Sequence, residues 1–74
     1  MAVQLPEHLT EKCRRFPEVH MGIWRVSVEL ADGRVCSGAE VGWSGEIIRV
    51  AGYPSIPFTA DEVADVHDGS DFDP

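Results

Sequence analysis

The sequence lacks the features that direct a chain into or across a membrane. No run approaches the roughly 18 apolar residues that a transmembrane helix needs. The opening residues MAVQLPEHLTEKC contain neither the basic segment nor the apolar segment of a signal peptide. The only cysteines are Cys13 and Cys36, and cysteines of cytosolic proteins are usually reduced and buried. We therefore expect a cytoplasmic protein with two free, buried thiols and no membrane association.

The sequence also lacks the patterns that mark most catalytic and metal-binding sites. Cysteine and histidine are scattered, with no C-x₂-C or H-x₃-H pair. None of the serines lies in a nucleophile elbow. A chain of 74 residues leaves little room for an enclosed pocket. We therefore expect a protein that is not an enzyme and that has no cofactor and no metal site.

Basic residues are missing from one end of the chain. Residues 61–74 hold six acidic side chains and no basic one, whereas residues 1–60 hold seven acidic and six basic ones. Most of the formal charge of −7 therefore lies at the C-terminal end. This end repels phosphate backbones and favours a basic protein surface, so we expect Asp61, Glu62 and Asp65 to bind such a partner. The alternative is a solubilising segment without a partner.

The clearest structural signal is the stretch from Trp24 to Val41, where two alternating runs meet at Asp32-Gly33. A two-residue turn at this dipeptide predicts a β-hairpin. The predicted pairs on its apolar face are Leu30 with Val35, Val28 with Ser37, Val26 with Ala39 and Trp24 with Val41. Gly38, in the middle of the second strand, predicts a bulge or bend. Trp24 is assigned to the core.

The remaining elements are shorter. Residues 6–16 predict a helix with an apolar stripe of Leu9, Cys13 and Phe16. Further strands are expected at 46–51, 53–58 and 63–67, the last of which closes on the first strand of the hairpin. Thr59 and Glu62 have the spacing of a capping box around one 3₁₀ turn. Residues 68–74 predict a disordered acidic tail. The expected fold is mainly β: one domain, residues 1–67, forming a small, strongly bent five-stranded antiparallel barrel of SH3-like or Sm-like type. A short N-terminal helix precedes it, and the 3₁₀ turn precedes its last strand.

Residues 26–34, VSVELADGR, together with the following Gly38 resemble the first Sm motif of Sm, LSm and Hfq proteins. The resemblance implies five bent strands behind an N-terminal helix. Sm proteins continue with an Asp and an Asn that contact RNA, but residues 42–45 read GWSG here and the chain contains no Asn. Residues 52–58 replace the Arg/Lys-Gly signature of the second motif. In architecture and charge the chain is similar to the Rof family, acidic bacterial Sm-like proteins that bind the terminator Rho.

These observations predict a small protein-interaction module. Trp43, at a turn, and Tyr53, after Gly52, would form an aromatic rim that docks a partner. An exposed strand edge could dock the partner instead. The alternative for the two rings is that both cover the core. Oligomerisation into homo-oligomers would supplement so small a core. A second hypothesis is a degenerate Sm-like RNA-binding protein that uses Arg25, Arg34 and Arg49; their alternative role is to face solvent and protect strand edges.

Overall fold

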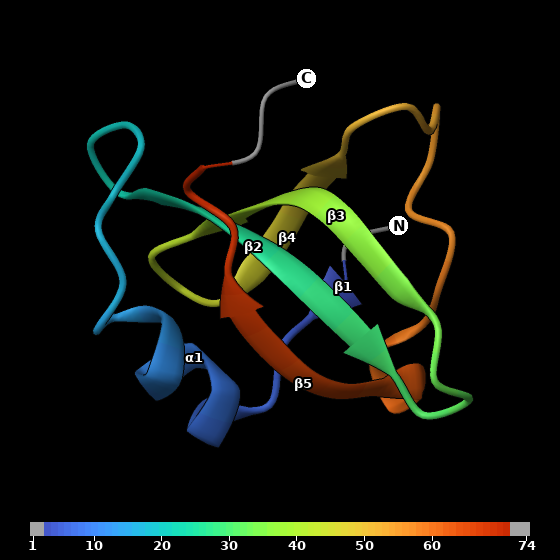
Figure 1. The fold of residues 1–74 in the computed structure, drawn as a ribbon. Coiled ribbons are helices and arrows are strands. Elements are labelled where there is room, and N and C mark those ends of the chain that lie inside the picture. Colours follow the sequence, from blue (N-terminus) through green and yellow to red (C-terminus); the bar gives the residue numbers. More distant parts are fainter. Residues whose placement is uncertain (1–2, 72–74) are drawn as a thin grey trace.

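The computed structural model describes residues 3–71 and shows an antiparallel five-stranded sheet curled into a half-barrel (Figure 1). The elements in chain order are β1 (Val3–Gln4), α1 (Glu7–Cys13), β2 (Ile23–Leu30), β3 (Val35–Gly42), β4 (Glu46–Val50), the 3₁₀ helix η1 (Ala60–Glu62) and β5 (Val63–Asp68). The strand order is β1-β4-β3-β2-β5. The predicted fold class is confirmed, and the half-barrel is compatible with an SH3-like or Sm-like small barrel.

The apolar core lies inside the curl of the sheet. Strand β2 supplies its centre, because its side chains alternate between buried and half-buried along the whole strand. Trp24 is only 3% exposed, so its assignment to the core is confirmed. The core residues are Val3, Leu5, Leu9, Cys13, Trp24, Val26, Val28, Leu30, Ala39, Val41, Ile47, Val50, Phe58 and Val66.

The β2–β3 hairpin has the predicted pairing at its open end only. There Trp24 lies opposite Val41 and Val26 lies opposite Ala39. Nearer the turn the pairs are Val28 with Cys36 and Glu29 with Val35, one residue away from the prediction. Val35 is consequently 58% exposed instead of lying on the apolar face, and Cys36 is half-buried rather than buried.

The length of the turn shifts the register by one residue, and a bulge farther along β3 reverses the shift. The connection has three residues, 31–33, because the Leu30 N–H donates to the Arg34 carbonyl at 2.8 Å, and Gly33 takes a φ of +93°. The predicted bulge then occurs at Gly38, whose φ is +76°, and two residues of β3 face one residue of β2. The bulge restores the predicted pairs beyond it.

The predicted strand at residues 53–58 is wrong. These residues form bends, because Pro54 and Pro57 have no N–H to donate to a neighbouring strand. The segment is held instead by Phe58, which is buried in the core. The fifth strand of the sheet is β1, which the sequence did not signal and which pairs Val3 with Ile47 on β4.

The helix and the capped turn are close to their predicted positions. Helix α1 is shorter than predicted, but Leu9 and Cys13 are buried and Phe16 packs against the core. The capping box is confirmed: the Thr59 N–H donates to Glu62 Oε1 at 2.9 Å at the start of η1. No helix within residues 3–71 is both long enough and apolar enough to cross a membrane.

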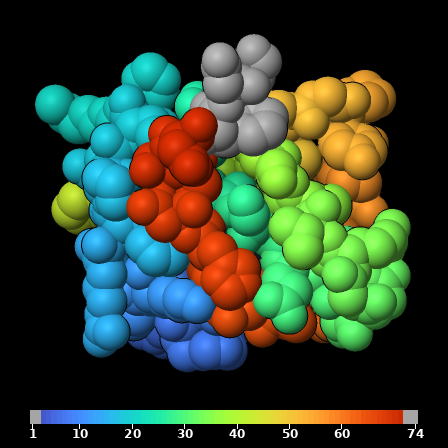
Figure 2. Space-filling view, in the orientation of Figure 1, coloured from blue at the N-terminus to red at the C-terminus, as the bar shows by residue number. Residues whose placement is uncertain are grey.

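Strand β5 pairs with β2, as predicted, and lies beside α1. In the space-filling view it runs between the blue N-terminal segment and the green hairpin (Figure 2). Asp68 is its last residue, and the Gly69 N–H donates to the Arg25 carbonyl at 2.9 Å, so these residues belong to the sheet region. The rest of the predicted tail of residues 68–74 lies partly outside the described residues, which end at Asp71.

Candidate functional site

The turn between β3 and β4 is packed directly against α1. Gly45 in this turn has a φ of +86°, and a Cβ atom built on it would overlap Thr10 Oγ1 of the helix. The Gly45 carbonyl also accepts a hydrogen bond from the Leu5 N–H at 2.9 Å. The turn and the helix therefore pack so closely that only glycine fits at position 45.

A cavity of about 420 Å³ lies where the helix, β2 and this turn meet. Its lining side chains come from three parts of the chain that the fold brings together: Arg14, Phe16, Glu18, Trp24 and Trp43. We call this cavity the aromatic groove. It combines three aromatic rings with one positive and one negative side chain, a composition typical of binding sites.

Trp43 forms the exposed wall of the aromatic groove. Its side chain is 65% exposed, yet its Nε1–H donates to Glu18 Oε2 at 2.9 Å. The same carboxylate oxygen accepts the Gly22 N–H at 2.9 Å, and the indole ring lies over Gly22. One hydrogen bond thus holds the indole of Trp43, and the Gly22 hydrogen bond holds the carboxylate that accepts it, although the Trp43 side chain is exposed.

Trp24 contributes a buried polar atom to the same region. Its Nε1–H is closed to solvent and finds no acceptor within residues 3–71. Leaving a buried donor without a partner costs about 1–3 kcal/mol. Trp24 also lines the aromatic groove, so this unsatisfied donor belongs to one of the groove's own side chains.

The predicted aromatic rim is divided between two places. Trp43 and Tyr53 are both exposed, Tyr53 at 53%, but they lie at opposite ends of β4. Only Trp43 lines the aromatic groove. Sequence reasoning missed its other members, because Phe16 and Glu18 are more than twenty residues away from Trp43 and nothing local links them.

The predicted acidic surface, Asp61, Glu62 and Asp65, is partly engaged within the chain. Glu62 serves in the capping box, and its Oε2 lies 3.9 Å from Arg34. Asp65 Oδ1 accepts hydrogen bonds from Lys12 Nζ at 2.9 Å and from the Val66 N–H at 2.8 Å. The Lys12 hydrogen bond, followed by the Val66 one, lowers the pKa of Asp65. Only Asp61 of the three is exposed and free of a polar partner in the described part of the chain.

The predicted basic cluster is neutralised by neighbouring acids. Arg25 on β2 and Arg49 on β4 both lie 3.5 Å from Glu40 on the strand between them. Arg34 lies apart from them in the hairpin turn, where its Nε donates to Asp32 Oδ2 at 2.7 Å. The hydrogen bonds from the Arg34 backbone and side chain lower the pKa of Asp32. The three arginines therefore do not form one open basic surface.

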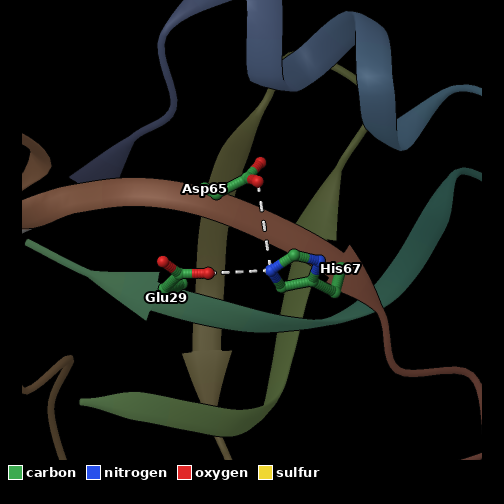
Figure 3. A group of neighbouring side chains, drawn as sticks. All are labelled: Glu29, Asp65 and His67. Atoms are coloured by element: carbon green, nitrogen blue, oxygen red, sulfur yellow. Dashed lines mark hydrogen bonds and ion pairs between the residues drawn. The ribbon is translucent and has the colours of Figure 1, made fainter. Parts of the chain in front are cut away.

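A second group of polar side chains lies on β2 and β5 (Figure 3). His67 Nε2 is 3.0 Å from Glu29 Oε1 and 3.9 Å from Asp65 Oδ2. One donor atom from each residue lies within 4.8 Å of the others, the kind of grouping that can hold a metal ion. Local spacing does not predict this group, because Glu29 and His67 are 38 residues apart and are joined only by the β2–β5 pairing.

In comparisons with known proteins, no family model, no curated protein and no solved structure matches this chain.

Proposed function

We propose that this protein is a small, non-enzymatic interaction module that docks a partner protein in the aromatic groove. The observation that carries the proposal is an exposed, hydrogen-bonded Trp43 that lines one groove with Trp24, whose buried Nε1–H has no acceptor among residues 3–71. Tryptophan is enriched among the residues that dominate binding energy at interfaces. A backbone carbonyl of a partner would satisfy the Trp24 donor, after a small movement of a groove side chain such as Trp43.

The finer features of the proposal rest on composition and on the Sm resemblance. We place the half-barrel among the Sm-like or SH3-like barrels, acting in the cytoplasm. The formal charge of −7 attracts basic partners over a distance, and the exposed Asp61 is the acidic side chain best placed to contribute. Long-range attraction would then bring the partner to the groove, where apolar contact supplies the affinity.

RNA binding is the weaker proposal. Arg25, Arg34 and Arg49 each lie within 3.5 Å of a carboxylate oxygen. Neutralised arginines release few counterions from a phosphate backbone, and that release drives most nonspecific RNA affinity. No geometry in residues 3–71 favours this second function over the first.

Selection from a displayed library of random peptides tests the proposal. Peptides that bind the full chain should bind Trp43→Ala at least about tenfold more weakly, the loss expected for a hot spot. Tyr53→Ala is the matched control, because Tyr53 is an exposed aromatic outside the groove, and its affinity should stay within about twofold. Equal losses in the two variants, or no selected peptide, would contradict a site in the groove.

Nuclear magnetic resonance gives an independent readout. The chain has two tryptophans and therefore two indole N–H signals. The Trp24 signal should move downfield on binding, because its proton gains an acceptor. A Trp24 signal that does not move while the peptide binds would show that this N–H plays no part.

A further inference from the structure

The outer surface of β2 and β5 carries two carboxylates directly opposite each other. Glu29 and Asp65 are register partners in the antiparallel pairing of these strands. Like charges in this arrangement destabilise a sheet. His67, two residues after Asp65, lies between them but carries a positive charge only when it is protonated.

Lys12 compensates the charge of Asp65 from the side of the carboxylate that faces α1. It approaches from α1 and binds Asp65 Oδ1, the oxygen that also accepts the Val66 N–H. The other oxygen, Oδ2, is left facing His67. The carboxylate is thus oriented by groups outside the cluster, in the way that outer hydrogen bonds orient metal ligands.

The three free donor atoms are close to the spacing of a coordination shell. Ligands about 2.1 Å from a tetrahedral ion lie roughly 3.4 Å from one another. His67 Nε2 lies 3.0 Å from Glu29 Oε1 and 3.9 Å from Asp65 Oδ2, on either side of that value. Figure 3 shows both carboxylates directed toward the same imidazole nitrogen. Small side-chain rotations therefore suffice to place one ion among the three atoms.

We propose that Glu29, Asp65 and His67 bind a divalent transition-metal ion of the Zn²⁺ type. The ion takes the place of the hydrogen bond between the imidazole and Glu29 and neutralises the two like charges that face each other. One nitrogen and two oxygen ligands suit Zn²⁺, whereas Mg²⁺ and Ca²⁺ prefer oxygen alone. All three side chains are accessible to water, so solvent completes the shell. The site is separate from the aromatic groove and does not depend on the proposed function.

Calorimetric titration of the full chain with ZnCl₂ at neutral pH tests the site. We expect one ion per chain with a Kd below about 100 µM, and binding at least about tenfold weaker for MgCl₂. His67→Gln and Glu29→Gln should each weaken Zn²⁺ binding by about tenfold or more. Glu29 is the better carboxylate to change, because Asp65 also binds Lys12.

Two control variants exclude other zinc ligands. His20→Gln removes an exposed histidine elsewhere, and Cys36→Ser removes the more accessible thiol; both should bind Zn²⁺ like the unaltered chain. Circular dichroism before titration shows whether each variant is folded. Absence of Zn²⁺ binding, equal affinity for Mg²⁺, or unchanged affinity in a folded His67→Gln variant would overturn the proposal.

Discussion

The glycines in the two turns that flank β4 have the same φ but different surroundings. Gly45 before the strand and Gly52 after it both have a φ of +86°. A Cβ atom at position 45 would meet Thr10, whereas one at position 52 would meet nothing within 4 Å. Local turn geometry therefore requires glycine at both positions, but only Gly45 also serves the packing of a helix.

The aromatic residues beside these glycines differ in the same way. Trp43 is hydrogen-bonded to Glu18 and lines the aromatic groove. The Tyr53 side chain has no polar partner within residues 3–71, and only its backbone N–H is engaged, with the Val50 carbonyl at 3.2 Å. Two exposed aromatic side chains thus differ in whether the fold holds them, and a held side chain loses less entropy on binding.

The largest difference is expected between Gly45→Ala and Gly52→Ala. Each alanine is forced into the left-handed region, which costs about 1–2 kcal/mol. At position 45 the methyl group also overlaps Thr10, so the total loss should reach about 3 kcal/mol or more. Urea unfolding measures both values. Equal losses of unfolding free energy in the two variants would show that the Gly45 turn does not pack tightly against α1.

Labelling of Cys13 should reveal whether that loss opens the helix. Cys13 is fully buried on α1, and burial raises the pKa of its thiol to about 11, so it reacts only when the helix opens. In Gly45→Ala the labelling rate should rise about a hundredfold, as a loss of about 3 kcal/mol allows. Gly52→Ala should raise it by about tenfold or less. The half-buried Cys36 serves as the internal reference, and similar Cys13 rates in both variants would refute the role of the turn.

A smaller difference is expected between Trp43→Ala and Tyr53→Ala. Removing Trp43 deletes the hydrogen bond to Glu18 and the cover over Gly22, a loss of about 1–2 kcal/mol. Removing Tyr53 should cost less than about 0.5 kcal/mol, as usual for an exposed residue without partners. Thermal unfolding of both variants checks this. A Tyr53 variant as destabilised as the Trp43 variant would mean that the second turn is also packed.

The smallest effect concerns the contact of α1 with β5, away from both turns. The pKa of Asp65 is lowered in the folded state, chiefly by the hydrogen bond from Lys12. Its stabilising contribution is therefore complete above the ordinary aspartate pKa of about 3.9 and is lost as the pH falls through the lower folded value. Asp65→Asn should be less stable than the unaltered chain at pH 6, and the two urea midpoints should converge near pH 2. A constant difference across this range would exclude the ionic origin.

The sequence predicted the elements that local patterns determine. Alternation in β2 predicted its buried face, and Thr59 with Glu62 predicted the capped turn. The sequence did not predict β1, which depends on a distant contact. This strand has only two residues and forms because β4 has an edge with which it can pair. Residues 53–58 were expected to form a strand, but their prolines leave too few N–H donors for pairing.

The candidate sites were predictable only in part. The exposed position of Trp43 was one of two alternatives, because a ring at a turn can also cover the core, whereas the buried position of Trp24 follows from the hairpin pattern. The aromatic groove requires α1 to dock beside the β3–β4 turn, and the Glu29–Asp65–His67 group requires β5 to pair with β2. Local spacing does not predict the docking of α1. The pairing of β5 with β2 was expected, but not the register that brings these three side chains together.

The bulge at Gly38 has a consequence for how this hairpin can change in evolution. A three-residue turn displaces one strand by a residue, and the bulge cancels that displacement before the core pairs begin. A relative with a two-residue turn would need no bulge and hence no glycine at position 38. Deletion of one residue in the turn should therefore occur together with loss of that glycine, and insertion with its gain. An alignment with a single gap at the turn would misplace β3 between residues 34 and 38.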